Sequence, residues 1–335
     1  MENTRCSRCT RWQKISLSYI MYNHLLFCML RITFLGTGGS TPTPNRNPSA
    51  IAVNREGELI LFDCGEGAQQ QMMRAKSGMK ITSIFISHFH ADHVLGIPGL
   101  LQTMALQDRQ EPLEIYGPKQ VDKFLYHLLA LGYAGRNFEV KAIELRPGDV
   151  VRRAGYEIRV IKTVHNILSI GYVLEEDMRP GRFNREKAIE LGIKPGPFFS
   201  KLQSGRSILL DGKEIRPEQV VGPPRPGRKI VYTGDTRPCD SVIEASENAD
   251  LLIHDSTLSE ETKEYAINYM HSTALEAAEV AKKASVRKLI LTHISARYSD
   301  PGGASKLEEE ARCVFENTKV AKDLMTEEVG YRDGE

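Results

Sequence analysis

The chain has 335 residues, of which 41% are hydrophobic and 26% charged, a balance typical of globular proteins that excludes a collagen-like or wholly disordered chain. Its 44 Lys and Arg residues nearly match 43 Asp and Glu residues, so any site for a polyanion must be local. The six cysteines are too few and too scattered for a disulfide framework, which favours a reducing compartment and a cytoplasmic location.

The N-terminal region contains an apolar stretch at residues 15–30, preceded by four basic residues in the manner of a signal peptide. It is shorter than the roughly 18 apolar residues of a membrane span. Asn23 and His24 interrupt it, and no small-residue cleavage site follows. We therefore expect no membrane segment. Residues 1–28 are interpreted as a poorly ordered extension or a misassigned start, and the domain is expected to cover residues 29–335.

Strand-like and helix-like segments alternate along the rest of the chain. In the first half we expect strands at 30–35, 50–53, 59–62 and 81–87, a helix at 68–76, and a helix-like stretch at 94–101 interrupted by Pro98. Further strands are expected at 113–116, 156–163, 170–174, 229–232, 250–253 and 288–291, with helices at 118–131, 273–283 and 306–315. This alternation predicts an α/β layered fold.

One window differs in composition from its surroundings. Residues 178–229 contain 7 of the 16 prolines and 7 of the 27 glycines, with 12 Lys and Arg against 5 Asp and Glu. A basic segment rich in Pro and Gly between two strands predicts an insertion that projects from the core, at about 178–228. A solvated surface loop is the alternative, and charge alone favours it.

The strongest chemical signal is the segment 87–93, SHFHADH, at the end of a predicted strand. In an extended segment His88 and His90 point to the same side, whereas Asp92 and His93 follow the turn, so one loop offers two pairs of ligands. Imidazole with carboxylate suits Zn²⁺ or a similar divalent ion, and two pairs indicate two metal ions.

Three further residues of ligand type follow predicted strands, namely His165, Asp235 and His293. Each by itself has an alternative role as a capping or packed polar group. Together they fit one site at the carboxyl ends of the strands, which the segment 87–93 cannot complete alone.

These motifs resemble the metallo-β-lactamase superfamily and, within it, the ribonuclease Z family of tRNA 3′-processing endoribonucleases, from residue 29 to the C-terminus. The matching segments are FLGTG (34–38), LFDCGEG (61–67), SHFHADH (87–93), LGIKPGP (191–197), GDTR (234–237), HST (271–273) and LTHISARY (291–298). The resemblance implies an αββα four-layer sandwich with an inserted flexible arm. It also implies a homodimer in which the arm of one subunit serves the active site of the other.

By this resemblance, two Zn²⁺ ions hydrolyse the phosphodiester that joins the 3′ trailer to precursor tRNA. One ion would be held by His88, His90 and His165, the other by Asp92, His93 and His293, with Asp235 bridging. Asp92 is expected to orient the attacking water and take its proton, and His271 to protonate the leaving oxygen. A helix-terminal surface histidine is the alternative for His271.

Supporting roles are expected around this centre. Asp63 would orient a ligand histidine, with a strand-end cap as the alternative. Arg297 and Arg46 are expected to contact phosphate. Gly196 and Pro197 resemble the tip of the family's arm, which grips the tRNA body. His254, with Asp255, fills a motif position that is expected to be supporting and not catalytic.

One departure concerns the loop at 42–47, where Pro44 replaces the lysine of the family's P-x-K-x-R-N pattern, and this leaves the cleavage position open.

A small-molecule hydrolase of the same superfamily, a lactonase or thioester hydrolase, is the alternative function, because it could share every ligand. A non-catalytic RNA-binding subunit would have lost ligands, and none is missing.

Overall fold

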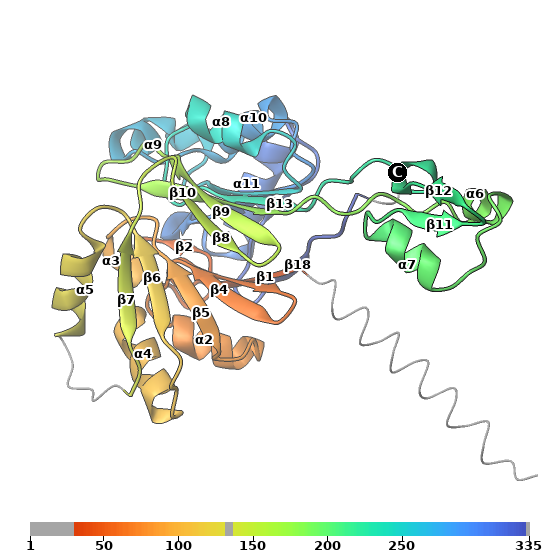
Figure 1. Cartoon of the computed structure of the whole chain (residues 1–335). Helices are drawn as coiled ribbons and strands as arrows, with labels where there is room; N and C mark the ends of the chain where they lie inside the picture. Colours follow the sequence, from red (N-terminus) through yellow and green to blue (C-terminus); the bar gives the residue numbers. More distant parts are fainter. Residues whose placement is uncertain (1–29, 131–136, 333–335) are drawn as a thin grey trace, which may run out of the picture.

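Two mixed β-sheets lie face to face in the computed structural model, which describes residues 30–130 and 137–332 (Figure 1). The predicted extension at 1–28 lies outside the described residues. The first sheet has the order β18 (Thr326–Glu328), β1 (Leu30–Gly36), β3 (Ala50–Arg55), β4 (Glu58–Phe62), β5 (Ile81–Phe85), β6 (Leu113–Gly117) and β7 (Val140–Glu144). The second has the order β17 (Thr318–Val320), β15 (Leu289–Thr292), β14 (Leu251–Asp255), β13 (Lys229–Tyr232), β10 (Ile170–Glu176), β9 (Tyr156–Lys162) and β8 (Val150–Arg153).

The main hydrophobic core fills the space between the two sheets. Aromatic side chains from both sheets meet there: the Phe62 ring stacks on Tyr172 and on Tyr232, each with 5.5 Å between centroids. Phe85 packs edge-on against Tyr172 at 5.3 Å. All four side chains are fully buried. Large aromatic groups in contact across the interface fix how one sheet lies on the other.

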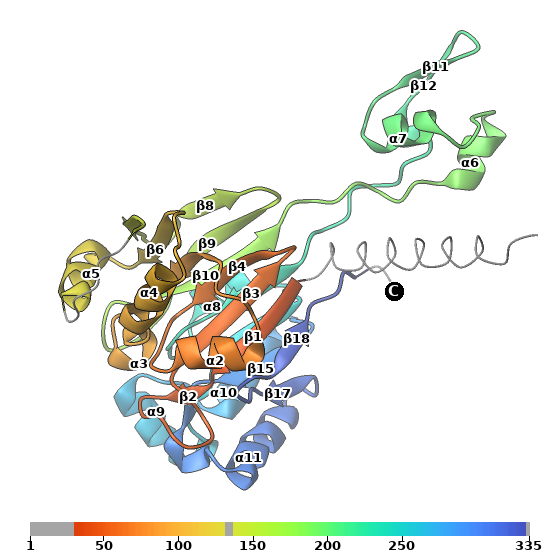
Figure 2. The same ribbon diagram turned by 90° about the horizontal axis from the view of Figure 1, so that it is seen from below.

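Helices cover the two outer faces of the sandwich. The first sheet carries α2 (Ala68–Ala75), α4 (Ile97–Leu106) and α5 (Val121–Leu129), whose buried side chains form one apolar cluster with that sheet. The second carries α8 (Asp240–Ser246), α10 (Ala274–Lys283) and α11 (Pro301–Arg312) in the same way. The αββα four-layer sandwich is therefore confirmed, and Figure 2 shows its layers from a second side.

Two of the helix boundaries that differ from the sequence prediction lie at prolines, both for the same reason. Pro98 lies in the first turn of α4 instead of interrupting a helix, and Pro301 begins α11 five residues before the predicted start. Proline is tolerated there because the first helical N–H groups have no intrahelical acceptor. Asp300 caps α11 by accepting a hydrogen bond from the N–H of Gly303 at 2.9 Å.

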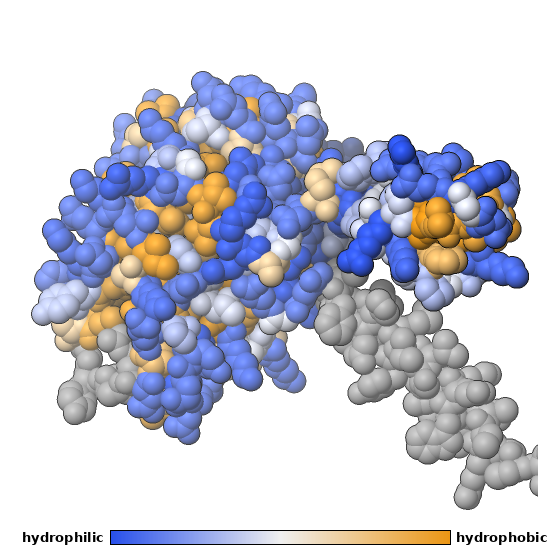
Figure 3. Space-filling model, in the orientation of Figure 1, coloured by the Kyte–Doolittle hydropathy of each residue, from blue (hydrophilic) through white to orange (hydrophobic). Residues whose placement is uncertain are grey.

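The chain between β10 and β13 leaves the sandwich and forms a small module, which we call the arm (178–228). It contains α6 (Arg185–Glu190), α7 (Pro197–Gln203), η1 (Pro217–Gln219) and the hairpin β11 (Ile208–Leu210) with β12 (Lys213–Ile215). The arm has an apolar cluster of its own, made by Ala188, Ile193, Leu202, Ile208, Ile215 and Val220. Figure 3 shows that its surface in this view is largely hydrophilic, with a hydrophobic region at its outer end.

The remaining short elements lie where strands end. They are α3 (Ala91–Val94), the pair β2 (Gly38–Gly39) with β16 (Ile294–Ser295), η2 (Glu260–Thr262), α9 (Lys263–Tyr269) and η3 (Ala296–Tyr298). Among the described residues, we find no helix both long and apolar enough to cross a bilayer.

Candidate metal centre

Seven side chains of ligand type converge where strands of both sheets end. One group comprises His88, His90, His165 and Asp235, and a second comprises Asp92, His93 and His293. Within each group the donor atoms lie within 4.8 Å of one another. The chain segments that supply them follow β5, β9, β13 and β15, so the fold brings together residues as distant as 88 and 293.

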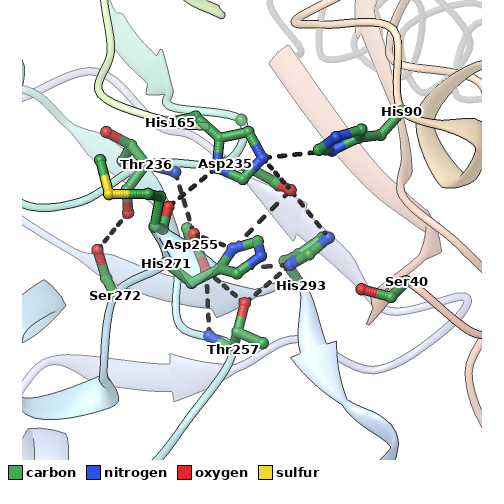
Figure 4. Close-up of polar contacts among 12 residues, drawn as sticks. Ser40, His90, His165, Asp235, Thr236, Asp255, Thr257, His271, Ser272 and His293 are labelled. Carbon is green, nitrogen blue, oxygen red and sulfur yellow. Dashed lines mark hydrogen bonds and ion pairs between the residues drawn. The ribbon is translucent and has the colours of Figure 1, made fainter. Parts of the chain in front are cut away.

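Asp235 lies between the two groups (Figure 4). Its Oδ2 is 3.5 Å from His88 Nε2 on one side and 3.3 Å from His293 Nε2 on the other. Its Oδ1 is 3.3 Å from His93 Nε2. A carboxylate that faces nitrogen atoms of both groups has the placement that a bridging ligand needs.

Hydrogen bonds at the outer nitrogens orient four of the five imidazoles. Their Nδ1 atoms lie near Ser87 Oγ for His88 (3.0 Å), Asp63 Oδ2 for His93 (2.7 Å), the Met270 carbonyl for His165 (2.9 Å) and Thr257 Oγ1 for His293 (2.8 Å). Each Nε2 is thereby left to face the centre. Such outer partners are typical of metal-binding histidines, because they fix the ring and its tautomer.

Asp63 is the most heavily bonded of these outer partners. Its carboxylate accepts hydrogen bonds from the Ser87 N–H and Oγ–H, both at 2.7 Å, and from the Tyr232 hydroxyl at 2.6 Å, besides facing His93. The sequence analysis expects Asp63 to orient a ligand histidine, and the contact with His93 has that geometry.

The donor set fits a divalent metal site. His93 Nε2 and Asp235 Oδ1 are buried with no hydrogen-bond partner, and His88 Nε2 faces His90 Nδ1 at 3.0 Å. Burial, reinforced by the neighbouring His93, lowers the pKa of His88 well below its usual value, which leaves the imidazole neutral as a ligand must be. Imidazoles and carboxylates facing one another in this way form a divalent metal site.

Asp92 belongs to the second group and also borders a cavity. Burial would raise its pKa, but the hydrogen bond with His293 and nearby imidazoles outweigh burial and lower the pKa, so Asp92 is ionised. Its Oδ2 accepts the Ser40 N–H at 2.7 Å and lies 3.2 Å from His293 Nε2. The sequence analysis did not identify Ser40, whose only signal is its place directly after the glycine-rich turn.

His271 lies beside the two groups and is paired with Asp255. Its Nδ1 is 2.9 Å from Asp255 Oδ2, and that carboxylate also accepts hydrogen bonds from Thr236 and Thr257. Burial opposes a charge on the imidazole, but Asp255 outweighs it and raises the pKa of His271 to about 9. Asp255, expected only as a supporting residue, therefore holds His271 protonated through Nδ1 and leaves Nε2 to carry a transferable proton.

The HST motif fixes His271 to the start of α10. The Ser272 hydroxyl donates to the Thr236 carbonyl at 2.6 Å, and Thr273 caps the helix in a capping box with Glu276. Arg237 donates to the His271 carbonyl at 2.5 Å and pairs with both oxygens of Glu276. The GDTR and HST segments thus form one unit around this imidazole.

A cavity of about 380 Å³ opens beside the donors. Its wall includes His90, Asp92, Asp235, His271, Ser40, Asn166, Tyr265, Tyr269 and Arg297. The guanidinium carbon of Arg297 lies 4.9 Å from the centre of the Tyr265 ring, and 47% of Tyr265 and 60% of Tyr269 are exposed. The sequence analysis missed both tyrosines, because a helical tyrosine has no distinguishing local pattern.

Arg46, a predicted substrate contact, has surroundings other than those expected. Arg46 is 3% exposed and donates through Nη1 to Thr37 Oγ1 at 2.7 Å and to the Ala321 carbonyl at 2.6 Å. The expectation that it contacts phosphate is therefore wrong: the guanidinium is used inside the protein to hold the loop at 42–47. Gly196 and Pro197 lie at the start of α7 in the arm, away from the metal donors.

Sequence comparison finds two family matches and many curated relatives. Residues 30–179 match the family "Anti-Pycsar protein Apyc1", and residues 217–294 match the "Beta-lactamase superfamily domain". The chain is 60% identical to the ribonuclease Z of Methanosarcina acetivorans over 305 residues, which are 91% of this chain and 99% of that protein. It is 47% identical to the ribonuclease Z of Myxococcus xanthus, with the same coverage.

Solved structures with the same fold include the short form of human tRNase Z, with a TM-score of 0.65 and 28% identity over 90% of this chain and 99% of that chain. The metallo-β-lactamase fold protein YhfI from Bacillus subtilis has a TM-score of 0.64 and 23% identity, with the same coverage. At that identity the second likeness concerns the fold alone.

Proposed function

Because this chain belongs to the ribonuclease Z family, we propose that it is a zinc-dependent endoribonuclease that removes the 3′ trailer from tRNA precursors. The products would be a tRNA with a 3′-hydroxyl and a trailer with a 5′-phosphate. One observation carries the proposal: three of the seven clustered donors, His90, Asp92 and Asp235, line the same open cavity as His271. A cytoplasmic location accords with such a substrate.

We assign one zinc ion to His88, His90 and His165 and the other to Asp92, His93 and His293, with Asp235 shared between them. Bound there, divalent cations would lower the pKa of water towards 7 and stabilise negative charge on phosphoryl oxygens. The buried nitrogen and oxygen atoms without hydrogen bonds support this assignment.

Two side chains handle the protons of the reaction. Asp92 borders the cavity, so it can orient the attacking water and take its proton as the new bond between oxygen and phosphorus forms. His271, protonated beside Asp255, can give a proton from Nε2 to the 3′ oxygen as its bond to phosphorus breaks. Asp92 therefore takes one proton from water, and His271 gives one to the leaving oxygen.

The outer wall of the cavity suits RNA. Arg297 offers a fork of donors to a phosphate near the cleaved bond. Tyr265 and Tyr269 expose aromatic faces on which an unpaired base at the 3′ end can stack. A lactonase or thioester hydrolase would need a closed pocket and no basic arm, so these features favour the nuclease.

The decisive assay uses purified protein and a 3′-extended precursor tRNA, with and without a chelator. We expect release of one trailer that stops on chelation and resumes with zinc. Asp92→Asn and His271→Ala should each lower the rate by about 10²–10⁴-fold. Ser256→Ala is the matched control, because that buried hydroxyl near the site has no hydrogen-bond partner. Turnover of lactones or thioesters without trailer release would refute the proposal.

We further propose a homodimer in which each arm contacts the tRNA bound to the other subunit. The arm joins β10 at Glu176 and β13 at Lys229, whereas Asp235 follows the opposite end of β13. The seven residues of β10 span about 20 Å at roughly 3.3 Å per residue, which separates the root of the arm from the metal donors of its own subunit.

Two experiments test this role. Deletion of residues 178–228 should spare hydrolysis of a small phosphodiester and greatly weaken cleavage of precursor tRNA, because remote contacts orient a large substrate. Equal loss of both activities would contradict it. Mixing the deleted protein with Asp92→Asn protein should restore activity if the arm acts across the dimer, and no restoration would show that it does not.

A further inference from the structure

The root of the arm is fixed by a buried ion pair. Arg228, which is 1% exposed, pairs through Nε and Nη2 with the two oxygens of Glu176, both at 2.7 Å. Arg55 adds a contact to Glu176 Oε1 at 2.9 Å. The two points where the chain leaves and re-enters the sandwich are therefore held together inside the protein.

Beyond this pair, two chain segments run side by side as a stalk (177–183 and 221–228), which Figure 2 shows leaving one end of the sandwich. Backbone hydrogen bonds of 2.7 and 2.9 Å join Arg179 to Arg225, and a second bridge joins Phe183 to Val221. At Gly181 a Cβ would collide with the Gly222 carbonyl, so the segments are closely packed. A two-stranded ribbon is marginally stable by itself, so its direction depends on contacts with the body.

The chain after β18 provides such a contact. Arg228 Nη1 donates to the Val329 carbonyl at 3.1 Å. The guanidinium carbons of Arg179 and Arg228 lie 3.6 and 4.2 Å from the centre of the Tyr331 ring. One ring thus contacts an arginine in the stalk and an arginine at the root.

Tyr331 is itself held on both sides by the sandwich. Before it, β18 pairs with β1, and the Val329 N–H donates to the Leu30 carbonyl at 2.9 Å. After it, Arg332 Nε contacts Asp250 Oδ1 at 2.7 Å and Nη2 contacts the Asn248 carbonyl. The ring is therefore a fixed point of the body against which the stalk rests.

The positive charge of the stalk explains why an aromatic ring suits this contact. Arg179, Arg182 and Arg225 place three guanidinium groups in the stalk beside one carboxylate, Asp177, while the charge of Arg228 at the root is paired with Glu176. An aromatic face attracts such cations without adding a negative charge that would repel RNA. The arginines can then be held in place while the stalk remains positively charged.

We propose that Tyr331 is a positioning residue that sets the direction of the arm, and so the affinity for precursor tRNA, without taking part in the chemistry. This inference rests on the proposed function of the arm. Tyr331→Ala should raise KM for precursor tRNA about tenfold, with kcat and the hydrolysis of bis(p-nitrophenyl) phosphate within about twofold of the unchanged enzyme. Tyr331→Phe should behave like the unchanged enzyme, because it keeps the ring.

The test compares the two variants with Tyr126→Ala, which removes an exposed tyrosine on α5 far from the stalk. Hydrogen exchange of full-length protein provides a readout that needs no tRNA: Tyr331→Ala should speed exchange of the hydrogen-bonded amides of Arg179 and Arg225 and leave both sheets unchanged. Unaltered exchange, an unaltered KM, or equal loss of both activities would overturn the inference. If the unchanged enzyme cleaves the small phosphodiester but no precursor tRNA, the proposed function fails, and the exchange result still decides whether Tyr331 holds the stalk.

Discussion

The pairing of His271 with Asp255 leads to a quantitative prediction about pH. Asp255→Asn removes the charge that holds the pKa of His271 at about 9 instead of its ordinary 6.5. Asparagine keeps the size of the side chain, and its oxygen can still accept hydrogen bonds from Thr257, whereas its NH2 group replaces the oxygen that accepts the Thr236 N–H. The change therefore acts mainly on the protonation of His271.

The size of the effect follows from these two pKa values. At pH 7.5 a pKa of about 9 keeps about 97% of His271 protonated, whereas without the Asp255 charge burial favours the neutral ring, so the protonated fraction and the rate of trailer release should fall by roughly tenfold or more. In the proposed mechanism the protonated form of His271 is the active one, so activity should be full below its pKa and fall above it. Bound cations would lower the pKa of His271 both in the unchanged enzyme and in Asp255→Asn, so the predicted quantity is the difference in this pKa between the two proteins.

The assay is single-turnover trailer release from pH 5.5 to 9.5 with saturating zinc. The alkaline limb should move to lower pH by about 2.5 units in Asp255→Asn, and the gap between the proteins should narrow towards pH 6. Ser256→Ala should follow the unchanged enzyme. If the two profiles keep the same shape and differ by a constant factor, His271 does not donate the proton, and the reasoning is refuted.

Three further outcomes are expected. Gly39→Ala should lower activity and zinc content, because a Cβ there would lie 2.7 Å from His293 Cε1. Gly330→Ala is the control and should change neither, because no atom lies near the added Cβ. Normal zinc content in Gly39→Ala would contradict the packing argument. Thr273→Ala should destabilise the protein by about 1 kcal/mol through loss of the capping box, which thermal unfolding measures. The same variant should lower kcat for trailer release, because His271 is then held less firmly. Chelation should lower the unfolding temperature as well as activity, because the buried imidazoles and carboxylates lose their shared cations. An unchanged unfolding temperature would argue against a structural contribution of the metals.

Much of the metal centre was predictable because its residues are marked locally. The segment 87–93 supplies four donors in one loop, and His165, Asp235 and His293 each follow a strand of apolar residues. Composition likewise marked the arm. Arg46 was misjudged because its partners, Thr37 and Ala321, include a residue 275 positions away, and no local pattern tells a buried arginine from one that faces substrate.

The sequence by itself predicted the central strands of both sheets, the residues that we propose as metal donors and the presence of a basic insertion. These depend on periodicity and on residue chemistry over short stretches. Only the tertiary structure decided that Asp255 charges His271, that Asp235 faces both donor groups, and that Tyr331 meets the arginines of the stalk. Each of these is a contact between segments far apart in the chain, and its strength depends on distance, burial and orientation, which exist only once the two sheets have packed.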